Sequence, residues 1–414
     1  MDNNKWQVPK GWKVKKLKDV FYINELSLPT DTPIKYQFRY IPIERVSTNH
    51  IAFDDCELFR FGDAPGRARR ILRENDILIS GVRPNLKAFA IFKKPDTNDN
   101  WICSTGFFVL TAKNEEDNLI SYYELLSEIG GSQFYSYVAG TNYPAIGGSD
   151  IRNLRLMLPS SEKEKRVIAN IFFKVDEAIA SVQNSIAAAE RLKKSLMQNL
   201  LTGKMKPDGT FRNPEEFYID EKFGKVPVGW EVKKVKQCFK FKNGKGNTTN
   251  NLREIPDSEY CIPVFGGNGI TGYYHSALLN EPTIIIGRVG EYCGNAFQTP
   301  NKSWVTDNAM LVSDVLMKGY NMDFFTLKLN SLNFKQYSDS TGQPKITQGS
   351  IGSVLIAYPS MVKEQKNIMF LINRVLNIVQ QEKNKVITLE RLKRSLMQNL
   401  LTGKVKVKHF IHNR

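Results

Sequence analysis

The sequence contains few of the residues that most often bind metals. Its 414 residues include 4 histidines and 5 cysteines. The cysteines stand singly, with no CxxC pair and no neighbouring histidine cluster, at Cys56, Cys103, Cys238, Cys261 and Cys293. This distribution argues against a disulfide framework and against a zinc site. We therefore expect no metal centre.

Long apolar runs are also missing. No stretch approaches the roughly 18 consecutive apolar residues that a membrane-spanning helix requires. The first residues, MDNNKWQVPKGWKVKKL, lack the apolar segment of a secretion signal. We expect a cytoplasmic protein without membrane association.

Motifs for catalysis are absent or lie in unsuitable contexts. The phosphate-binding pattern GxxxxGK[ST] does not occur, and neither does an Asn-Pro-Pro-Tyr-like motif for adenine methylation. FGGNG at 265–269 is interpreted as a turn rather than a cofactor loop. Pro207-Asp208 with Asp220-Glu221-Lys222 imitates a nuclease pattern, but it lies in a polar segment where acidic residues are common. We expect no catalytic centre and no cofactor in this chain.

The formal net charge of the chain is +16. A basic excess of this size indicates a polyanionic partner, either nucleic acid or an anionic membrane. A basic surface without such a partner is the alternative that charge alone leaves open.

The main feature is an internal repeat, which indicates a duplicated architecture. RLKKSLMQNLLTGKMK at 191–206 recurs as RLKRSLMQNLLTGKVK at 391–406, identical at 14 of 16 positions and offset by 200. VPKGWKVKKLKDVF at 8–21 recurs as VPVGWEVKKVKQCF at 226–239, offset by 218. Between these matches, 22–140 and 240–340 share little sequence. One frame therefore carries two different inserts.

Each repeat ends in a predicted long helix. Apolar residues recur in steps of four and three, the heptad pattern of a coiled coil. The principal predicted seam positions are Ile168, Phe172, Val175 and Ile179 in the first copy, and Ile368, Ile372, Val375, Val379, Leu396 and Leu400 in the second. Pro159 and Pro359 precede the helices, and Gly203 and Gly403 follow them as stop signals. The obvious partner for each stripe is the other copy, although packing on its own domain is the alternative.

The inserts are predicted to be mixed α/β globules. Short strand-like runs such as DILIS, AFAIF, FFVLTA and TIIIG alternate with turn clusters, and helices are expected near 117–129 and 322–333. KMKPDGTFRNP at 204–214 has the composition of a linker. Trp12 and Trp230, symmetrically placed, are expected to pack at the helix ends.

The duplicated helix ends, the VPxGWxVKK segments, DILISGVRPNLKAFAIF and PTIIIGRVGEYCGNAF resemble the specificity subunits of type I restriction–modification enzymes. The resemblance covers nearly the whole chain. It implies an α+β fold in which two target-recognition domains are joined by two long helices packed as an antiparallel coiled coil, with pseudo-two-fold repetition. The corresponding boundaries are 1–155, 156–203 (helix), 204–218 (linker), 219–357, 358–406 (helix) and 407–414 (basic tail).

The resemblance also implies a function and partners. Each domain reads one half of a bipartite double-stranded DNA site, and the helices set the spacing. Two copies of an adenine methyltransferase subunit dock on the chain, and a restriction/translocase subunit joins the full complex. S-adenosylmethionine, ATP and Mg²⁺ belong to those partners. One departure is visible, since Tyr143 replaces the glutamine found at Gln343 in the second copy.

Basic residues in loops or beside strands are the candidates for DNA contact. They are Arg67, Arg69, Arg70, Arg83, Lys87, Lys240, Lys242, Lys245 and Arg288. The first three belong to an arginine-rich segment, part of which is interpreted as a loop because of Gly62 and Gly66. Arg83 and Arg288 are expected at similar positions after a strand. The alternative for Arg67, Arg69 and Arg70 is a solvated charged surface, and the alternative for Arg83, Lys87 and Arg288 is buried ion pairs. Lys240, Lys242 and Lys245 have the alternative of a half-exposed strand. Tyr273, Tyr274 and His275 are either base contacts or core aromatics.

Two other classes of protein compete with this interpretation. A single-chain DNA-modifying or DNA-cleaving enzyme should carry catalytic motifs, which we do not find. A pure coiled-coil adaptor explains the heptads but not the +16 charge or the two dissimilar inserts.

Overall fold

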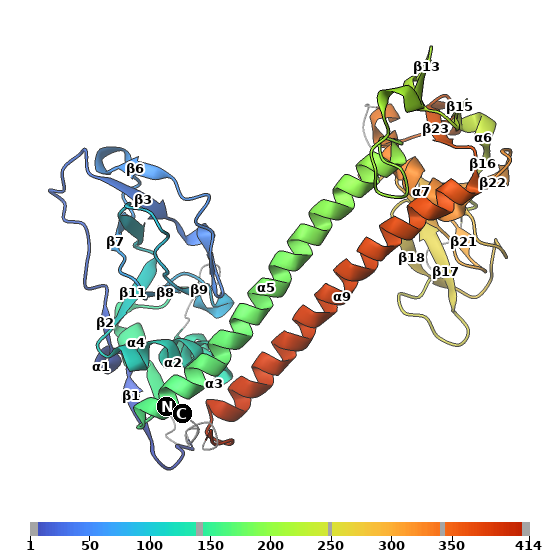
Figure 1. Cartoon of the computed structure of the whole chain (residues 1–414). Coiled ribbons are helices and arrows are strands. Elements are labelled where there is room, and N and C mark those ends of the chain that lie inside the picture. Colours follow the sequence, from blue (N-terminus) through green and yellow to red (C-terminus); the bar gives the residue numbers. More distant parts are fainter. Residues whose placement is uncertain (1–6, 138–143, 247–250, 340–343, 408–414) are drawn as a thin grey trace. The chain divides into compact units, whose positions relative to one another are not determined.

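The structure, a computed structural model, describes residues 7–137, 144–246, 251–339 and 344–407. It divides into two compact units (Figure 1). Unit 1 comprises 1–184 and 383–414, and unit 2 comprises 185–382. Both units therefore contain part of each long helix, α5 (Glu162–Leu201) and α9 (Val362–Leu400).

Unit 1 has two four-stranded sheets and two antiparallel two-stranded pairs. Its strands are β1 (Trp12–Lys16), β2 (Phe21–Ile23), β3 (Gln37–Ile41), β4 (Val46–Ser47), β5 (His50–Ile51), β6 (Leu58–Arg60), β7 (Ala68–Ile71), β8 (Ile77–Ser80), β9 (Phe89–Ile91), β10 (Trp101–Ser104), β11 (Phe107–Ala112) and β12 (Arg155–Pro159). Its helices besides α5 and α9 are α1 (Leu17–Val20), α2 (Glu115–Leu126), α3 (Glu128–Tyr137) and α4 (Gly148–Asn153), with 3-10 turns η2 (Ile43–Arg45), η3 (Phe61–Asp63) and η4 (Pro84–Leu86).

Unit 2 is built from a similar set of elements. Its strands are β13 (Phe217–Asp220), β14 (Gly224–Pro227), β15 (Trp230–Lys234), β16 (Phe239–Asn243), β17 (Ile262–Gly266), β18 (Gly269–Tyr274), β19 (Ile284–Gly287), β20 (Ala296–Gln298), β21 (Trp304–Val305), β22 (Ala309–Val315) and β23 (Leu355–Pro359). Its further helices are α6 (Val235–Cys238), α7 (Met322–Ser331) and α8 (Gln348–Gly352), with η5 (Pro214–Glu216) and η7 (Phe334–Tyr337).

The main sheets of the two units have the same strand order although the inserts differ in sequence, whereas the second sheet has four strands in unit 1 and three in unit 2. The main sheet is β2-β11-β8-β9 in unit 1 and β16-β22-β19-β20 in unit 2. In each unit the GW segment pairs antiparallel with the strand before the long helix, as β1 with β12 and as β15 with β23. The second sheet contains one parallel pair in each unit, β3 with β10 and β17 with β21. The duplicated flanks therefore enclose one architecture, and the sequence divergence falls within it.

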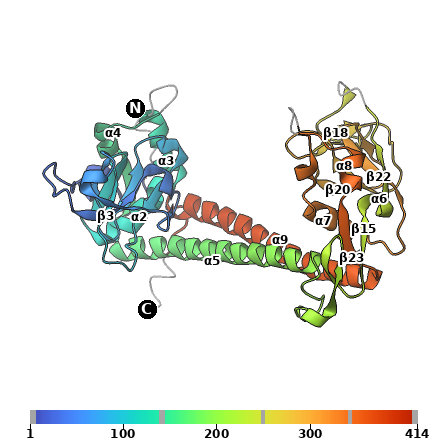
Figure 2. The same ribbon diagram turned by 90° about the horizontal axis from the view of Figure 1, so that it is seen from above.

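The long helices have 40 and 39 residues, as the repeat predicts. Within each unit a part of α5 runs beside a part of α9 (Figure 2). In unit 1, Lys393 Nζ lies 2.6 Å from Asp176 Oδ1, and Ile168, Phe172 and Leu400 share one apolar core. In unit 2, Leu200, Ile368 and Ile372 share another.

Burial follows the predicted heptad positions. Ile168, Phe172, Ile368, Ile372, Val375, Val379 and Leu400 are buried, and Val175, Ile179 and Leu396 are half-buried. Positions between them on the same helices are mostly exposed. Each helix thus presents one largely apolar stripe, interrupted by Lys193 in α5 and by Glu382 and Lys393 in α9.

The helix ends are closed by the predicted glycines. Gly203 (φ 71°) and Gly403 (φ 65°) adopt the left-handed conformation that ends many helices. A Cβ at Gly203 would lie 2.4 Å from Pro227 Cγ, and one at Gly403 would lie 2.4 Å from Pro9 Cγ. Trp230 and Trp12 are buried beside them, 4% and 8% exposed. The prediction that both tryptophans pack at the helix ends is confirmed.

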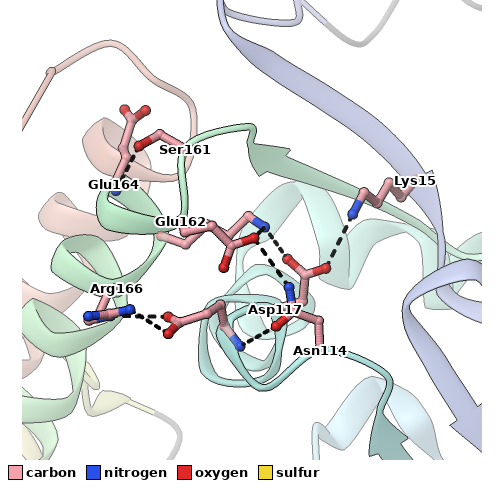
Figure 3. A network of polar contacts seen from close by, with 9 residues as sticks. Lys15, Asn114, Asp117, Ser161, Glu162, Glu164 and Arg166 are labelled. Atoms are coloured by element: carbon pink, nitrogen blue, oxygen red, sulfur yellow. Dashed lines mark hydrogen bonds and ion pairs between the residues drawn. The ribbon is translucent and has the colours of Figure 1, made fainter.

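The start of α5 is held to α2 by buried charge (Figure 3). Lys165 Nζ lies 2.5 Å from Asp117 Oδ1, and both residues are buried. Lys15 Nζ also reaches Asp117, at 3.2 Å, while Arg166 pairs with Glu116 at the surface at 2.6 Å. In unit 2 the buried Gln365 takes the place of Lys165 and accepts from the N–H of Asn321 at 2.9 Å.

Several sequence predictions of local structure are confirmed. The four strand-like runs form β8, β9, β11 and β19. The helix predicted near 117–129 is formed by α2 and the start of α3, and the helix predicted near 322–333 is α7. The part of the arginine-rich segment around Gly66 is a loop, as predicted, whereas Arg69 and Arg70 lie on β7 and are half-buried. The 204–218 segment contains the largely buried Arg212, whose Nη2 lies 2.6 Å from Glu364 Oε1. Tyr143, Gln343 and the tail beyond Val407 lie outside the described residues.

Candidate nucleic-acid interface

In unit 1 the connection between β10 and β11 organises one rim of the domain. The N–H of Thr105 donates to the carbonyl of Arg67 at 2.8 Å, and the N–H of Gly81 donates to the carbonyl of Gly106 at 2.8 Å. Arg83 follows Gly81 by two residues. Arg67 and Arg83, both exposed, therefore lie on neighbouring loops at this rim, which we call rim 1.

The other arginines of the predicted cluster lie further along the sheet and make local contacts. Arg69 stacks on Phe61, with its guanidinium carbon 4.6 Å from the ring centroid. Arg70 Nη1 donates to the hydroxyl of Ser27 at 2.7 Å. These contacts support a structural role for both side chains.

Lys87 is also held by the fold. Its half-buried Nζ donates to the carbonyls of Leu126 and Ser127, at 2.6 and 3.2 Å, at the C-terminus of α2. Desolvation lowers the pKa of this ammonium. A lysine at a helix C-terminus satisfies the unpaired carbonyls there. We therefore leave Lys87 out of the interface.

In unit 2 the corresponding connection, between β21 and β22, organises rim 2. The N–H of Lys245 donates to the carbonyl of Val305 at 2.9 Å, and the indole N–H of Trp304 donates to the carbonyl of Lys245 at 3.0 Å. Arg288 donates through its backbone N–H to Asn308 and through Nη1 to the carbonyl of Asp307, both at 2.9 Å. Lys245 and Arg288 thus lie at the same rim.

Glycines allow the loops of rim 2 to pack backbone against backbone. A Cβ at Gly244 would lie 2.1 Å from the carbonyl oxygen of Thr306, and one at Gly287 would lie 2.0 Å from that of Gly267. Gly267 belongs to the FGGNG segment, which forms the turn between β17 and β18, as the sequence predicts. Substitution at these glycines would displace the loops that carry the cations.

The lysines of β16 are on a half-exposed strand. Phe239 is buried, while Lys240 and Lys242 are exposed. Lys242 pairs with Leu311 towards rim 2, whereas Lys240 pairs with Asp314 towards the opposite end of β22. The structure thus brings Lys242 near Lys245 and leaves Lys240 away from the rim.

An aromatic cluster adjoins rim 2. Tyr274 lies 4.1 Å from His275 and 5.6 Å from Trp304, measured between ring centroids, and all three are at least partly exposed. Sequence reasoning named Tyr274 and His275 but missed Trp304, because its link to Lys245 depends on a contact between distant segments. Rings of this kind can stack on nucleic-acid bases.

Other features of the described chain do not form a site for chemistry. Asp208 and Asp220, the acidic residues of the nuclease-like pattern, each accept backbone N–H bonds that close a turn. Within the described ranges no group of three His, Cys, Asp or Glu side chains could hold a metal ion. Among the helices described, none is long and apolar enough to span a bilayer.

Comparison with known proteins decides the family. The sequence model of the type I restriction modification DNA specificity domain matches residues 9–191 and 227–391. The chain belongs to this family. The family predicted from the sequence is therefore confirmed, and the single-chain enzyme alternative is not favoured.

Individual family members are similar over different lengths. The chain is 22% identical to the type I restriction enzyme MjaVIII specificity subunit of Methanocaldococcus jannaschii, over 97% of this chain and 95% of that protein. It is 27% identical to the EcoprrI specificity subunit of Escherichia coli over 44% of each protein.

Solved structures of the family share the fold. A chain from a structure of type I R-M complex assembly superposes with a TM-score of 0.58 at 19% identity, covering 97% of this chain and 100% of that one. The S subunit from M. genitalium superposes with a TM-score of 0.57 at 15% identity, covering 97% and 98%.

Proposed function

We propose that the chain recognises a two-part double-stranded DNA site, with one half read at rim 1 and the other at rim 2. The observation that carries this proposal is the combination of one strand order with two different sets of rim side chains. Main sheets of one strand order present their loops in the same way, while different side chains on those loops contact different base edges. Base-edge contacts specify sequence, whereas phosphate contacts position the protein.

The long helices hold the two readers at a fixed spacing in this proposal. The apolar stripes of α5 and α9 pack as an antiparallel coiled coil, and the length of the pair sets the number of base pairs between the half-sites. The 2.6 Å pair between Lys393 and Asp176 supports this register. A polar contact on a mostly apolar seam is a common device for fixing register.

Two copies of an adenine methyltransferase subunit dock on the duplicated helix ends. The support is that exposed positions carry the same residue in both copies of the repeat. Exposed residues that bind no partner would be free to diverge between the copies. Leu192 and Leu392 are 50% and 48% exposed, although both are large and apolar. Gln198 and Gln398 are also exposed and identical. Replacing Leu192 or Leu392 by Asp should each remove one methyltransferase copy, as counted by native mass spectrometry of the complex.

The chemistry belongs to the partners. The methyltransferase subunit binds S-adenosylmethionine, and a restriction/translocase subunit uses ATP and Mg²⁺. The purified chain alone should bind DNA without methylating or cutting it. We place the complex in the cytoplasm.

The experiment is an exchange of inserts between this chain and a family member with a different target. Replacing 22–140 should change one half of the methylated site, and replacing 240–340 should change the other half. Reassembly of the chain with its original insert is the matched control. A change in both halves after either exchange would contradict independent reading.

A further inference from the structure

The loop after β8 is fixed by backbone hydrogen bonds at three successive positions. The N–H of Gly81 donates to the carbonyl of Gly106 at 2.8 Å, and the carbonyl of Gly81 accepts from the N–H of Ile146 at 3.0 Å. The N–H of Arg83 donates to the carbonyl of Pro144 at 2.7 Å. Between them, Val82 forms an isolated β-bridge with the residue after Pro144.

The loop after β19 repeats this frame bond for bond. The N–H of Arg288 donates to the carbonyl of Asn308 at 2.9 Å, and the carbonyl of Arg288 accepts from the N–H of Ile346 at 2.9 Å. The N–H of Gly290 donates to the carbonyl of Pro344 at 3.0 Å, and Val289 forms the isolated bridge. Matching bonds define a residue-by-residue register that the divergent sequences do not reveal.

In this register the cationic side chains have exchanged places. Arg83 in unit 1 corresponds to Gly290 in unit 2, which has no side chain. Three pairs of positions are equivalent: Gly81 with Arg288, Arg83 with Gly290, and Ala145 with Lys345. Unit 1 thus has a single cation on this frame, and unit 2 has two at other positions. Both Arg83 and Arg288 follow a strand, as the sequence predicts, and the backbone register places them two residues apart within the loop.

Backbone conformation indicates that the arginine in unit 1 is retained for its side chain. Both Arg83 (φ 50°) and Gly290 (φ 88°) are left-handed. Glycine adopts this conformation freely, whereas a residue with a Cβ is strained there. At this position unit 2 has a glycine, which is not strained, and unit 1 has an exposed arginine. Such strain is typically kept where a side chain has a function.

The cations of unit 2 lie on equivalent backbone without that strain. Arg288 is half-buried, and its Nη1 is oriented by the carbonyl of Asp307 at 2.9 Å. A guanidinium has five N–H donors, so this bond leaves others for a ligand. Lys345, which forms the isolated bridge with Val289, is exposed.

We propose that these registered positions determine specificity: Arg83 for the half-site read by unit 1, and Arg288 with Lys345 for the half-site read by unit 2. Each contacts the base edge of a guanine, the acceptor that Arg and Lys recognise through O6 and N7 in the major groove. The two halves of the target differ because the cations stand at different positions of one frame. This inference rests on the proposed function.

The experiment uses the full chain assembled with its methyltransferase subunit and measures initial methylation rates. Substrates are the native duplex and a set with single base-pair changes in each half. Arg83→Gly should slow methylation of the native duplex about tenfold, the usual effect of losing a bidentate base contact. It should also remove discrimination at one base pair of one half. The double variant Arg288→Ala/Lys345→Ala should act in the same way on the other half.

Matched controls come from exposed lysines beyond the opposite ends of the same sheets. Lys94 follows the end of β9 that pairs with the start of β8, and Lys318 lies beyond the far end of β22. Lys94→Ala and Lys318→Ala should leave rates and discrimination unchanged. The melting temperature of Arg83→Gly should not fall, because glycine is the residue that unit 2 carries at this position.

Three results would overturn the inference. Native rate and discrimination in Arg83→Gly would show that the arginine contacts no base. An equal loss on all duplexes would indicate a phosphate contact. A lowered melting temperature would make the arginine structural. If the unsubstituted complex shows no dependence on a two-part site, the proposed function itself fails, which is a separate outcome.

Discussion

The buried pair of Lys165 and Asp117 offers a sharp test of how unit 1 is held together. The Lys165 and Asp117 residues are 4% and 3% exposed, and their charged atoms are 2.5 Å apart. Replacing Lys165 by Met leaves the carboxylate buried with only the more distant Lys15, at 3.2 Å. Breaking a buried pair on one side costs about 3–5 kcal/mol.

The neighbouring pair provides the matched control. Arg166 lies one residue further along α5 and pairs with Glu116, but its side chain is 63% exposed. Surface pairs contribute at most about 1 kcal/mol. Arg166→Met should therefore cost far less than Lys165→Met, although both remove one cation from the same turn of α5.

The assay is differential scanning calorimetry of the full chain. For a unit of about 200 residues, 1 kcal/mol shifts the melting temperature by about 3 °C, so Lys165→Met should lower it by about 10 °C. The double variant Asp117→Leu/Lys165→Met should recover most of this loss, because both charges are then absent. Equal effects of Lys165→Met and Arg166→Met, or no recovery in the double variant, would refute the reasoning.

Three further predictions concern other parts of the chain. Burial raises the pKa of Glu124 to about 8, so the folded state keeps a proton that the unfolded state loses above about pH 4.5, and the stability of the fold falls as the pH rises from 4.5 to 8. Glu124→Gln should therefore raise the melting temperature more at pH 8 than at pH 5. An equal gain at both pH values would contradict the raised pKa. Gly203→Ala should lower the stability of the fold by about 1–3 kcal/mol, because the residue is left-handed and its Cβ would meet Pro227. The control Gly209→Ala, also left-handed but with no atom near its Cβ, should lose only the energy of the strained backbone. Similar melting temperatures of the two variants would exclude the steric contribution. Inserting one heptad after Ala188 and another after Gln380 should lengthen both helices by about 10 Å and widen the gap between the half-sites by about three base pairs. The gap is read from a map of methylated sites. An unchanged gap in an active variant would mean that the helices do not set the spacing.

The repeat and the helices could be predicted from sequence because their signals are local. Heptad spacing selects the buried stripe of α5 and α9, and Gly203 and Gly403 mark the helix ends before any tertiary contact is known. The strands β8, β9, β11 and β19 could be located for the same reason, from short β-branched runs bounded by turns. Their order could not, since it depends on pairing between segments far apart in the chain.

The candidate interface was only partly predictable. Composition drew attention to the arginines near Arg67, but only the fold separates Arg67 at the rim from Arg69 and Arg70 along β7. The capping role of Lys87 and the equivalence of Arg83 with Gly290 depend on hydrogen bonds between distant backbone groups. The sequence around a basic side chain does not indicate which backbone carbonyl the side chain will contact in the folded protein.

We propose that this chain selects the DNA site of its complex through two independent readers. The most direct measurement is a genome-wide map of N6-methyladenine in host strains that carry the chain, lack it, or carry it with the 22–140 insert exchanged. We expect one two-part motif to be methylated only when the chain is present, and the exchange to alter one half of that motif while the other half stays the same. Methylation of the same motif in the strain without the chain would contradict the account.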